Sequence, residues 1–394
     1  MSRVFPFVGL LFDRERVGSL DLVTTPPYDV ISPADRRRFQ ALSPYNVIRL
    51  ELGERAPGGD PDDQYRGAAD TLRRWRETGV LRPTDGPAYF AYEMRFRLHG
   101  RDRRVRGVVA AVELEDWGGS ILPHERTMPG PIEDRLRLLR ATGANLSCIQ
   151  AVFTGPIPDL ARMLDALTVA APDACAMDEA GVEHRLWVVP PERLELGRLL
   201  EPERLMIADG HHRYTTALRY RDEMRERHGP GPWDRVMMLL VDATLEDPPV
   251  LPYHRLLLEG DPDVGTGTRV PDLHELIDGV DDERSIFGLV TLDRGTLAHH
   301  LVRLEGAEPP TVLAIHRGPL AGKDPHLRFT PDAAAAEDAV RRGRARAAFI
   351  LPPTSARRIR EVVERGERLP QKSTFFWPKP RSGMVIRALD ADRG

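Results

Sequence analysis

Cysteine and long apolar runs are scarce in this sequence. Only Cys148 and Cys175 occur among 394 residues, too few for a disulfide framework or a cysteine-only zinc site. No run of about 18 apolar residues is present, so we expect no transmembrane helix. The first 16 residues hold a short apolar run that contains Pro6 and Gly9 and ends in charges, so we expect no signal peptide. These absences favour a soluble, cytoplasmic protein.

An excess of charge of one sign is also absent. The 56 basic and 60 acidic residues leave a net charge of −4, which argues against a dedicated nucleic-acid-binding protein. No GxGxxG, GxxxxGK[ST] or GxSxG motif occurs at the required place, so Rossmann, P-loop and α/β-hydrolase folds are poorly supported. No membrane partner is expected either, and the oligomeric state stays open.

What the chain does contain is the alternating pattern of a mixed α/β protein. We expect helices in residues 33–44, 61–81, 132–143, 195–203 and 356–368, strands in 46–53, 185–190, 204–208 and 235–244, and a hairpin in 87–116 with its turn near Gly100. Residues 328–355 read as a helix followed by a strand. The loop at 258–267 is the best candidate linker.

The stretch IADGHHRYTTALRYRDEM, from Ile207 to Met224, concentrates the polar residues most typical of a binding site. Apolar spacing predicts a strand that ends at Ala208 and a helix that begins near His211. Gly210 lies in the turn, where backbone can approach a ligand. A helix start attracts anions, Arg213 suits phosphate or carboxylate, and His212 adds a donor. Asp209 could bind Mg²⁺ or act as a base.

Two other interpretations of the stretch from Ile207 to Met224 are a simple helix cap and a zinc site. Asp209 could simply cap the helix while the histidines lie on the surface. A zinc site fits less well, because adjacent histidines point apart on a helix and no third ligand lies at motif spacing. A cap explains only one of the five polar residues, so we favour an anion site.

Further polar clusters lie elsewhere in the chain. ILPHERTMPG contains His124 and Glu125, a candidate base beside a histidine, but Met128 rules out a zincin motif. A solvated loop explains that segment equally well. In QKSTFFWPKPRSGMVI, cations and hydroxyls flank aromatic residues and could bind a nucleotide, or the aromatics could be core and the lysines their rim. The candidate residues in these and related segments are Tyr28, Asp29, Asn145, His254, Arg255, Lys372, Ser373, Thr374 and Lys379; for His254 and Arg255, an internal ion pair is the alternative.

The motifs PPYDVIS, NVIRLELG, PHERT with DRLRLLRATGANLS, ADGHHRYTTAL, LPYHRLL and PQKSTFFWPKPRSGMVI together resemble domain-of-unknown-function family 1015, over residues 5–388. A strand followed by Asp-Gly-His-His-Arg and a helix is also similar to the phosphate-binding motif of the ParB/sulfiredoxin superfamily, which includes CTP-binding partition proteins, sulfiredoxins and free serine kinases. The sulfiredoxin cysteine has no counterpart here, because His211 and His212 occupy that stretch.

The resemblance implies a nucleotide-dependent phosphotransferase that acts on a small hydroxyl compound. Family members tend to be encoded beside serine-biosynthesis genes, which favours free serine as the acceptor and ATP or ADP with Mg²⁺ as cofactors. The alternatives are a non-catalytic nucleotide-binding regulatory module and a metal-dependent hydrolase.

In this interpretation the site residues fall into three groups. Glu125, Asp209 and His124 are catalytic, with Asp209 as the metal ligand and Glu125 as the favoured base. The nucleotide phosphates contact Gly210, His211, His212, Arg213, Lys372, Ser373 and Thr374, and the acceptor contacts Tyr28, Asp29, Asn145, His254 and Arg255.

The implied architecture is a ParB/sulfiredoxin-like core with a large inserted or companion lobe. Residues 1–60 and 201–260 would form the core, residues 61–200 the lobe, and residues 268–394 a C-terminal α/β segment of the same family-wide unit.

Overall fold

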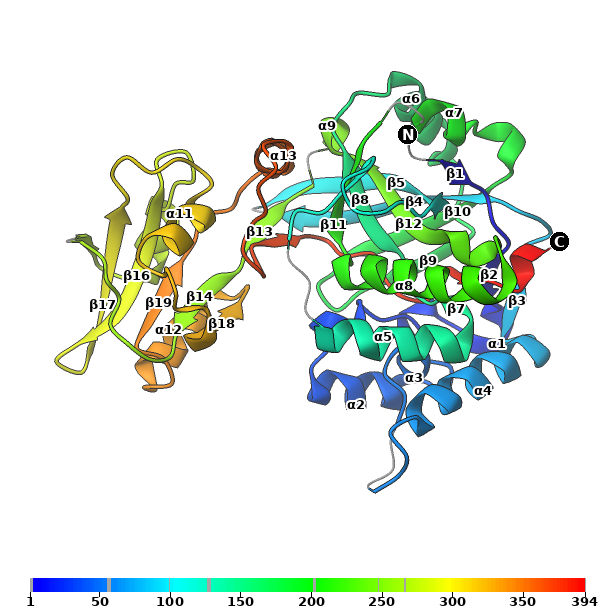
Figure 1. Ribbon diagram of the computed structural model, residues 1–394, viewed down its shortest axis with the longest axis horizontal. Coiled ribbons are helices and arrows are strands. Elements are labelled where there is room, and N and C mark those ends of the chain that lie inside the picture. The colour runs from blue at the N-terminus through cyan, green and yellow to red at the C-terminus, as the bar shows by residue number, and fades with distance from the viewer. Residues whose placement is uncertain are drawn as a thin grey trace. The chain divides into compact units, whose positions relative to one another are not determined.

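The structure is a computed structural model that describes residues 3–54, 58–98, 100–125, 129–200, 203–246, 248–265 and 267–393. It divides into two compact units (Figure 1). Unit 1 comprises residues 1–123, 127–247 and 378–394, and unit 2 comprises residues 124–126 and 248–377. Helices and strands occur in both, which confirms the predicted mixed α/β class.

Unit 1 is built on a nine-stranded mixed sheet. The strand order is β6-β11-β8-β12-β5-β4-β10-β9, and β1 pairs with β5. The β11–β6 and β12–β8 pairs are parallel, and the others are antiparallel. The bounds are β1 Val4–Phe5, β4 Tyr89–Leu98, β5 Arg101–Glu113, β6 Ile121–Leu122, β8 Ile149–Phe153, β9 Ala174–Met177, β10 Glu183–Val189, β11 Leu205–Asp209 and β12 Arg235–Asp242.

Both faces of this sheet are buried: Phe90, Val109 and Leu239 lie on one face, and a hydrophobic cluster lies on the other. Alternate residues of β5, such as Val108, Ala110 and Val112, point into this cluster, as the two-residue period of a strand requires. Tyr214 and Ala217 of one covering helix pack against them. Each large apolar side chain buried in this way contributes about 1.5–3 kcal/mol, so the sheet and that helix hold each other in place.

Helices complete unit 1. In Figure 1 α5 and α8 run side by side, and their contact buries Leu136, Leu139 and Tyr220. The bounds are α1 Arg14–Val17, α2 Pro33–Leu42, α3 Ile48–Glu51, α4 Asp63–Glu77, α5 Pro129–Thr142, α6 Pro158–Leu167, α7 Leu196–Leu200, α8 His211–His228 and α9 Ala243–Glu246. A small sheet of order β3-β2-β21-β7 joins distant parts of the chain, with bounds β2 Gly9–Phe12, β3 Leu81–Pro83, β7 Ala144–Asn145 and β21 Ile386–Ala388.

One predicted strand is wrong. Residues 46–53 were expected to be extended, but Ile48–Glu51 form the short helix α3. The Asn46 side chain accepts a hydrogen bond from Ile48 N at 3.0 Å and donates to Leu22 O at 2.7 Å. Ile48 and Leu50 are buried. Local capping and tertiary burial therefore outweigh the strand preference of the apolar residues.

Unit 2 contains a six-stranded sheet of order β15-β17-β16-β19-β14-β18 and the pair β13–β20. The helices α10 and α12 share its core, which includes Leu276, Val290 and Val340. The bounds are β13 Val250–Pro252, β14 His254–Leu257, β15 Thr268–Val270, α10 Leu273–Gly279, β16 Ile286–Asp293, β17 Thr296–Arg303, α11 Thr311–Arg317, β18 Leu327–Thr330, α12 Ala333–Arg341, β19 Ala347–Ile350, α13 Ala356–Glu364 and β20 Thr374–Phe376.

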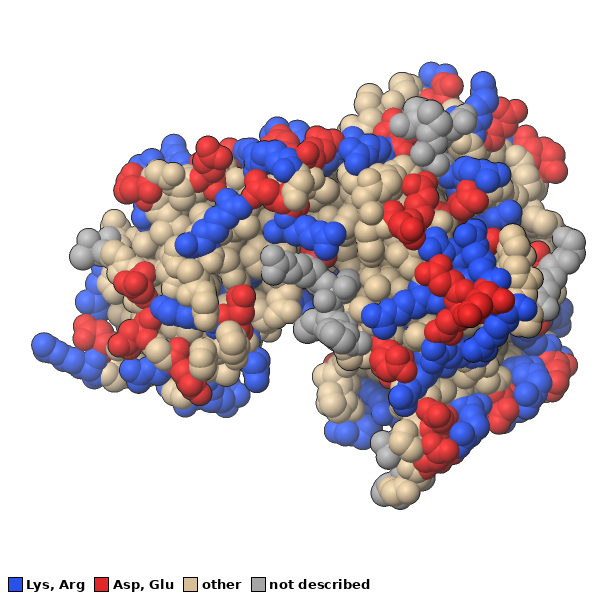
Figure 2. All heavy atoms as spheres, viewed as in Figure 1, with Lys and Arg blue, Asp and Glu red and all other residues tan. Residues whose placement is uncertain are grey.

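Two general features bear on the expectations from sequence. On the face shown in Figure 2, basic and acidic side chains are interspersed over unit 1, and many form ion pairs such as Arg140–Glu223 at 2.5 Å. Among the residues that the structure describes, no helix has both the length and the apolar character needed to cross a membrane. Strands from residues 89–189 share the large sheet with β11 and β12, while the predicted division into core and lobe stays a prediction.

Candidate functional site

The turn between β11 and α8 has the geometry that the sequence predicts. Residues 205–208 are buried, and the helix begins at His211. Gly210 is its N-cap residue, with φ 98° and ψ 28° in the left-handed region, where other residues are strained. A Cβ added there would lie 3.0 Å from Arg213 Nε. The positive end of an 18-residue helix therefore faces a turn that only glycine fits well.

Asp209 binds two cationic side chains at this turn. Its Oδ2 accepts from Arg213 Nη2 at 2.5 Å, and its Oδ1 accepts from Lys379 Nζ. The side chains of Asp209 and Arg213 are each 11% exposed, and that of Lys379 is 8% exposed. We call Asp209, Gly210, Arg213 and Lys379 the cradle. It gathers two nearly buried positive charges at the start of a helix.

Arg213 is held from a second side as well. Its Nη1 donates to Cys148 O at 2.6 Å, so two separate nitrogens of the guanidinium are engaged. Burial lowers the pKa of Arg213, but the charges of Asp209 and Asp29 outweigh that effect and hold the pKa above its ordinary value. Arg213 is therefore a fixed cation rather than a solvated helix residue.

The assignment of Asp209 as a magnesium ligand stays a prediction. Mg²⁺ requires carboxylate oxygens that are available for coordination, whereas each oxygen of Asp209 binds a cationic side chain. Across the described parts of the chain, no group of three or more His, Cys, Asp or Glu side chains is arranged to hold a metal ion. In the structure, Asp209 forms ion pairs with Arg213 and Lys379.

The two histidines occupy the first turn of α8. His211 is buried and His212 is half-buried. The His211 carbonyl accepts a hydrogen bond from Thr215 Oγ1 at 3.0 Å, a bond within α8 itself. Both residues thus lie next to Gly210 as predicted, and their part in phosphate binding stays a prediction.

Tyr28 and Asp29 lie near the cradle, in a 3₁₀ helix that spans Tyr28–Val30. The guanidinium of Arg135 lies 4.1 Å from the centre of the Tyr28 ring, a cation–π contact. Burial raises the pKa of Tyr28 well above its ordinary value, although the charges of Arg135 and Arg213 oppose the rise. Asp29 is exposed. The segments PPYDVIS and ADGHHR, expected to meet, are thus electrostatic neighbours.

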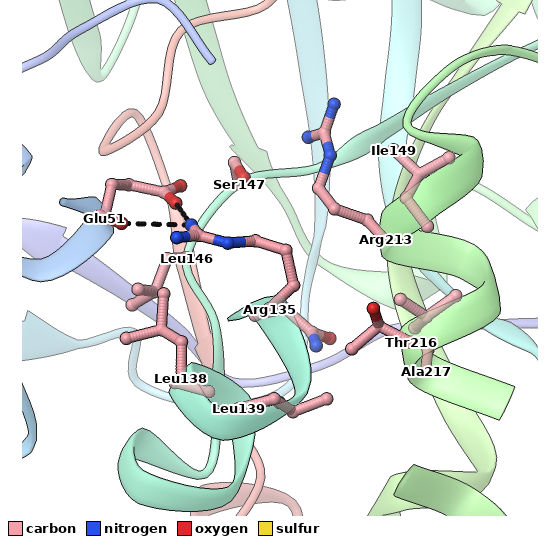
Figure 3. Close-up of a pocket in the computed structure, with 13 residues that line it drawn as sticks. Glu51, Arg135, Leu138, Leu139, Leu146, Ser147, Ile149, Arg213, Thr216 and Ala217 are labelled. Atoms are coloured by element: carbon pink, nitrogen blue, oxygen red, sulfur yellow. Dashed lines mark hydrogen bonds and ion pairs between the residues drawn. The ribbon is translucent and has the colours of Figure 1, made fainter. Parts of the chain in front are cut away.

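A cavity of about 60 Å³ lies beside Arg213 (Figure 3). A buried ion pair lines it: Arg135 Nη1 lies 3.0 Å from Glu51 Oε2 and also donates to the Glu51 carbonyl at 3.0 Å. Asn145 lines the cavity too, and its Oδ1 accepts from Met237 N at 3.1 Å and from Arg387 Nη1 at 3.1 Å. The cavity residues are Glu51, Arg135, Leu138, Leu139, Ala144, Asn145, Leu146, Ser147, Ile149, Arg213, Thr216, Ala217 and Val236.

Sequence reasoning missed Glu51 and Arg135 as residues of this region. Glu51 lies within the segment expected to be a strand, and Arg135 lies within the motif DRLRLLRATGANLS, which carries only a family resemblance. Lys379 was grouped with Lys372, Ser373 and Thr374, whereas the structure places Lys379 in unit 1 and the other three in unit 2. A contact between residues 170 positions apart leaves no local signal in the sequence.

The remaining predicted residues form a second polar cluster, within unit 2. His124 is buried, and its Nε2 lies 2.7 Å from Thr374 Oγ1. The Lys372 backbone N–H donates to Glu125 Oε1, and the Lys372 ammonium lies 5.3 Å from the centre of the Tyr253 ring. The segment with His124 and Glu125 is thereby joined to residues 372–374.

Arg255 is the centre of this cluster and is fully buried. It donates to Tyr253 O, to Ser373 Oγ at 3.3 Å and to His316 Nε2 at 3.2 Å. Burial lowers the pKa of Arg255 to about 9. Burial and the neighbouring Arg255 lower the pKa of His254 to about 4. Among the described residues, no carboxylate lies within ion-pair distance of Arg255, and hydrogen bonds to neutral groups hold its guanidinium.

The comparisons with known proteins identify the family. Residues 4–302 match the family described as protein of unknown function (DUF1015). The chain belongs to this family. No curated protein matches it at a significant level.

Several solved structures are similar to this DUF1015 member at low identity. A free serine kinase in complex with AMP is 14% identical to this chain; the match covers 65% of this chain and 83% of the kinase chain, with a TM-score of 0.34. A mutant of that kinase in complex with ADP is 13% identical over the same shares, with a TM-score of 0.36. A C-terminally truncated SbnI from Staphylococcus aureus is 13% identical over 70% and 85%, with a TM-score of 0.41.

Proposed function

We propose that this protein is a nucleotide-dependent phosphotransferase that acts on a small hydroxyl compound, with free serine as the leading acceptor. The observation that carries the proposal is the cradle: Arg213 and Lys379 converge on the positive end of α8, next to a left-handed glycine. Phosphoryl transfer relies mainly on positioning and on fixed positive charge around the phosphates. Two nearly buried cations at a helix start supply both.

In the proposed mechanism, ATP or ADP binds with its phosphates at Gly210, His211, His212 and Arg213. The guanidinium of Arg213 and the ammonium of Lys379 balance the phosphate charge, and Asp209 keeps both cations in place. No step is assigned to Mg²⁺ at Asp209, since that carboxylate already binds two cations. The partners in this proposal are a nucleotide and a small-molecule acceptor, in the cytoplasm.

The acceptor needs a carboxylate that can take its hydroxyl proton. Asp29 is exposed, and its charge acts on Arg213, so we propose that it binds or deprotonates the acceptor, next to Tyr28 and Asn145. Glu125 is the base favoured from sequence and remains a second proposal, together with His124, His254, Arg255, Lys372, Ser373 and Thr374 in unit 2.

The direct test is to incubate the purified protein with ATP or ADP and pooled amino acids, with and without Mg²⁺, and to search for a phosphorylated product by mass spectrometry. Phosphoserine formation is expected. Nucleotide binding without any product would instead favour the regulatory module. The variants Asp29→Asn and Glu125→Gln identify the base. Replacing the true base by its amide should abolish turnover and leave the nucleotide affinity within about twofold of the wild type.

A further inference from the structure

Gln150 is a buried polar residue that the proposed function does not yet use. It lies on β8 and is 1% exposed. Within the part of the chain that the structure describes, neither its side-chain nitrogen nor its side-chain oxygen has a hydrogen-bond partner. Most buried polar side chains in native proteins are hydrogen-bonded. A carboxamide with both ends unpaired in a packed sheet therefore indicates a missing partner.

The sheet places this carboxamide beside the cradle. Gln150 pairs directly with Asp209 across the antiparallel β8–β11 ladder, and directly paired residues have their side chains on the same face. The register shifts between Ile207 and Asp209. That irregularity turns Asp209 away from the core face to which Ile207 belongs and towards the face of Gln150.

The carboxylate of Asp209, the residue paired with Gln150, does not satisfy the Gln150 side chain. The oxygens of Asp209 accept from Arg213 and Lys379, and Leu239, the partner of Gln150 on the other side, is apolar. The missing partner must both accept from the amide nitrogen and donate to the amide oxygen. A phosphate oxygen only accepts, so it can satisfy the amide nitrogen but not the amide oxygen. A hydroxyl group meets both requirements.

We propose that the Gln150 carboxamide binds the hydroxyl group of the acceptor. The inference deepens the proposed function and rests on it, because a phosphate acceptor must present its hydroxyl next to the nucleotide phosphates. The amide oxygen accepts a hydrogen bond from the hydroxyl group, and the amide nitrogen donates one to the hydroxyl oxygen. The ligand class is thus a small metabolite that carries an alcohol, and Gln150 is a substrate-binding residue.

The test compares L-serine with L-alanine, which lacks only the hydroxyl. Binding of each to the protein saturated with ADP is measured by calorimetry for the wild type, Gln150→Met and Gln40→Met. Gln40 is a matched control, because its amide nitrogen is also buried without a hydrogen-bond partner but lies on α2. The wild type and Gln40→Met should bind serine about tenfold more tightly than alanine, the effect of two neutral hydrogen bonds. In Gln150→Met the ratio should fall to about one.

Thermal unfolding without ligand separates this role from a structural one. Methionine keeps the volume and removes the unpaired polar atoms, so Gln150→Met should unfold at the same temperature as the wild type or higher. A loss of several degrees would mean that a buried water already satisfies the amide, and would overturn the inference. An unchanged serine-to-alanine ratio in Gln150→Met, or equal binding of the two by the wild type, would overturn it as well.

These outcomes are distinct from failure of the proposed function. If ATP yields no phosphoserine but the serine preference depends on Gln150, phosphoryl transfer is wrong and the hydroxyl site stands. If phosphoserine forms and Gln150→Met keeps the wild-type ratio, the transfer stands and the Gln150 assignment is wrong.

Discussion

Replacing Arg213 with lysine separates the charge of this residue from its shape. Lysine preserves the net charge but has one nitrogen where the guanidinium has three. In the protein, Nη1 and Nη2 of Arg213 bind two different acceptors, Cys148 O at 2.6 Å and Asp209 Oδ2 at 2.5 Å. The single ammonium group of a lysine can bind one of these two acceptors, so the variant loses the hydrogen bond to the other acceptor.

The magnitude follows from the burial of the pair. Both side chains are 11% exposed, so the lost bond is not a solvent-screened surface contact. A hydrogen bond to a charged group contributes about 1.5–3 kcal/mol. In a domain of this size, about 1 kcal/mol shifts the melting temperature by roughly 2–4 °C, so Arg213→Lys should melt roughly 3–12 °C lower. If the guanidinium also forms a charged bond to phosphate, ADP should bind about tenfold to a hundredfold more weakly.

The assay is thermal unfolding together with ADP titration at fixed salt. Arg219→Lys is the matched control, because Arg219 lies on the same helix, is exposed, and should change stability by less than about 0.5 kcal/mol. Unfolding curves of Arg213→Lys that superimpose on the wild type would refute the energetic argument. A lower melting temperature with unchanged ADP affinity would instead make Arg213 purely structural and remove it from the phosphate site.

Three other changes test the surroundings. Gly210→Ala forces alanine to φ 98° beside Arg213 and should destabilise the protein by about 1–3 kcal/mol in urea unfolding; equal stability would mean that the turn relaxes freely. Glu51→Gln removes one of the two carboxylates that pair with Arg135 and leaves Asp134, at 2.6 Å; it should lower the free energy of unfolding by about 1.5–3 kcal/mol, and a melting curve that superimposes on the wild type would contradict this. Burial lowers the pKa of His254 to about 4 from about 6.5. The unfolded chain therefore takes up a proton first as the pH falls from 6.5 towards 4, and the free energy of unfolding drops by about 3 kcal/mol over this range. His254→Gln should flatten the acid branch of the stability profile, and an unaltered profile would contradict the lowered pKa of His254.

Local signals in the sequence predicted the turn at the candidate site correctly. The apolar residues before Asp209 and the helical spacing after His211 fix where β11 ends and α8 begins, and both depend only on neighbouring residues. The hairpin of β4 and β5 was predictable for the same reason, since Gly100 with φ 74° lies between two alternating runs.

The errors come from contacts between distant segments. Residues 46–53 have the composition of a strand, but the Asn46 side chain and the burial of Ile48 and Leu50 stabilise a helix. No pattern in that segment predicts the ion pair between Glu51 and Arg135, which is 84 residues away. Side-chain partners at such separations are set by how the elements pack, so sequence patterns predict the elements and not the pairs.

Asp209 illustrates why the local sequence does not determine what a carboxylate binds. A carboxylate next to Gly210 suggests a metal ligand when only the local sequence is known. Arg213 and Lys379 are 11% and 8% exposed, and two like charges brought so near each other out of water need a counter-charge to remain there. Asp209 supplies it in the absence of a ligand. In the proposed function, a bound phosphate adds further negative charge to the same two cations, so the carboxylate and the ligand share them. The affinity of this site for anions is therefore limited by the same aspartate that keeps the cations in position.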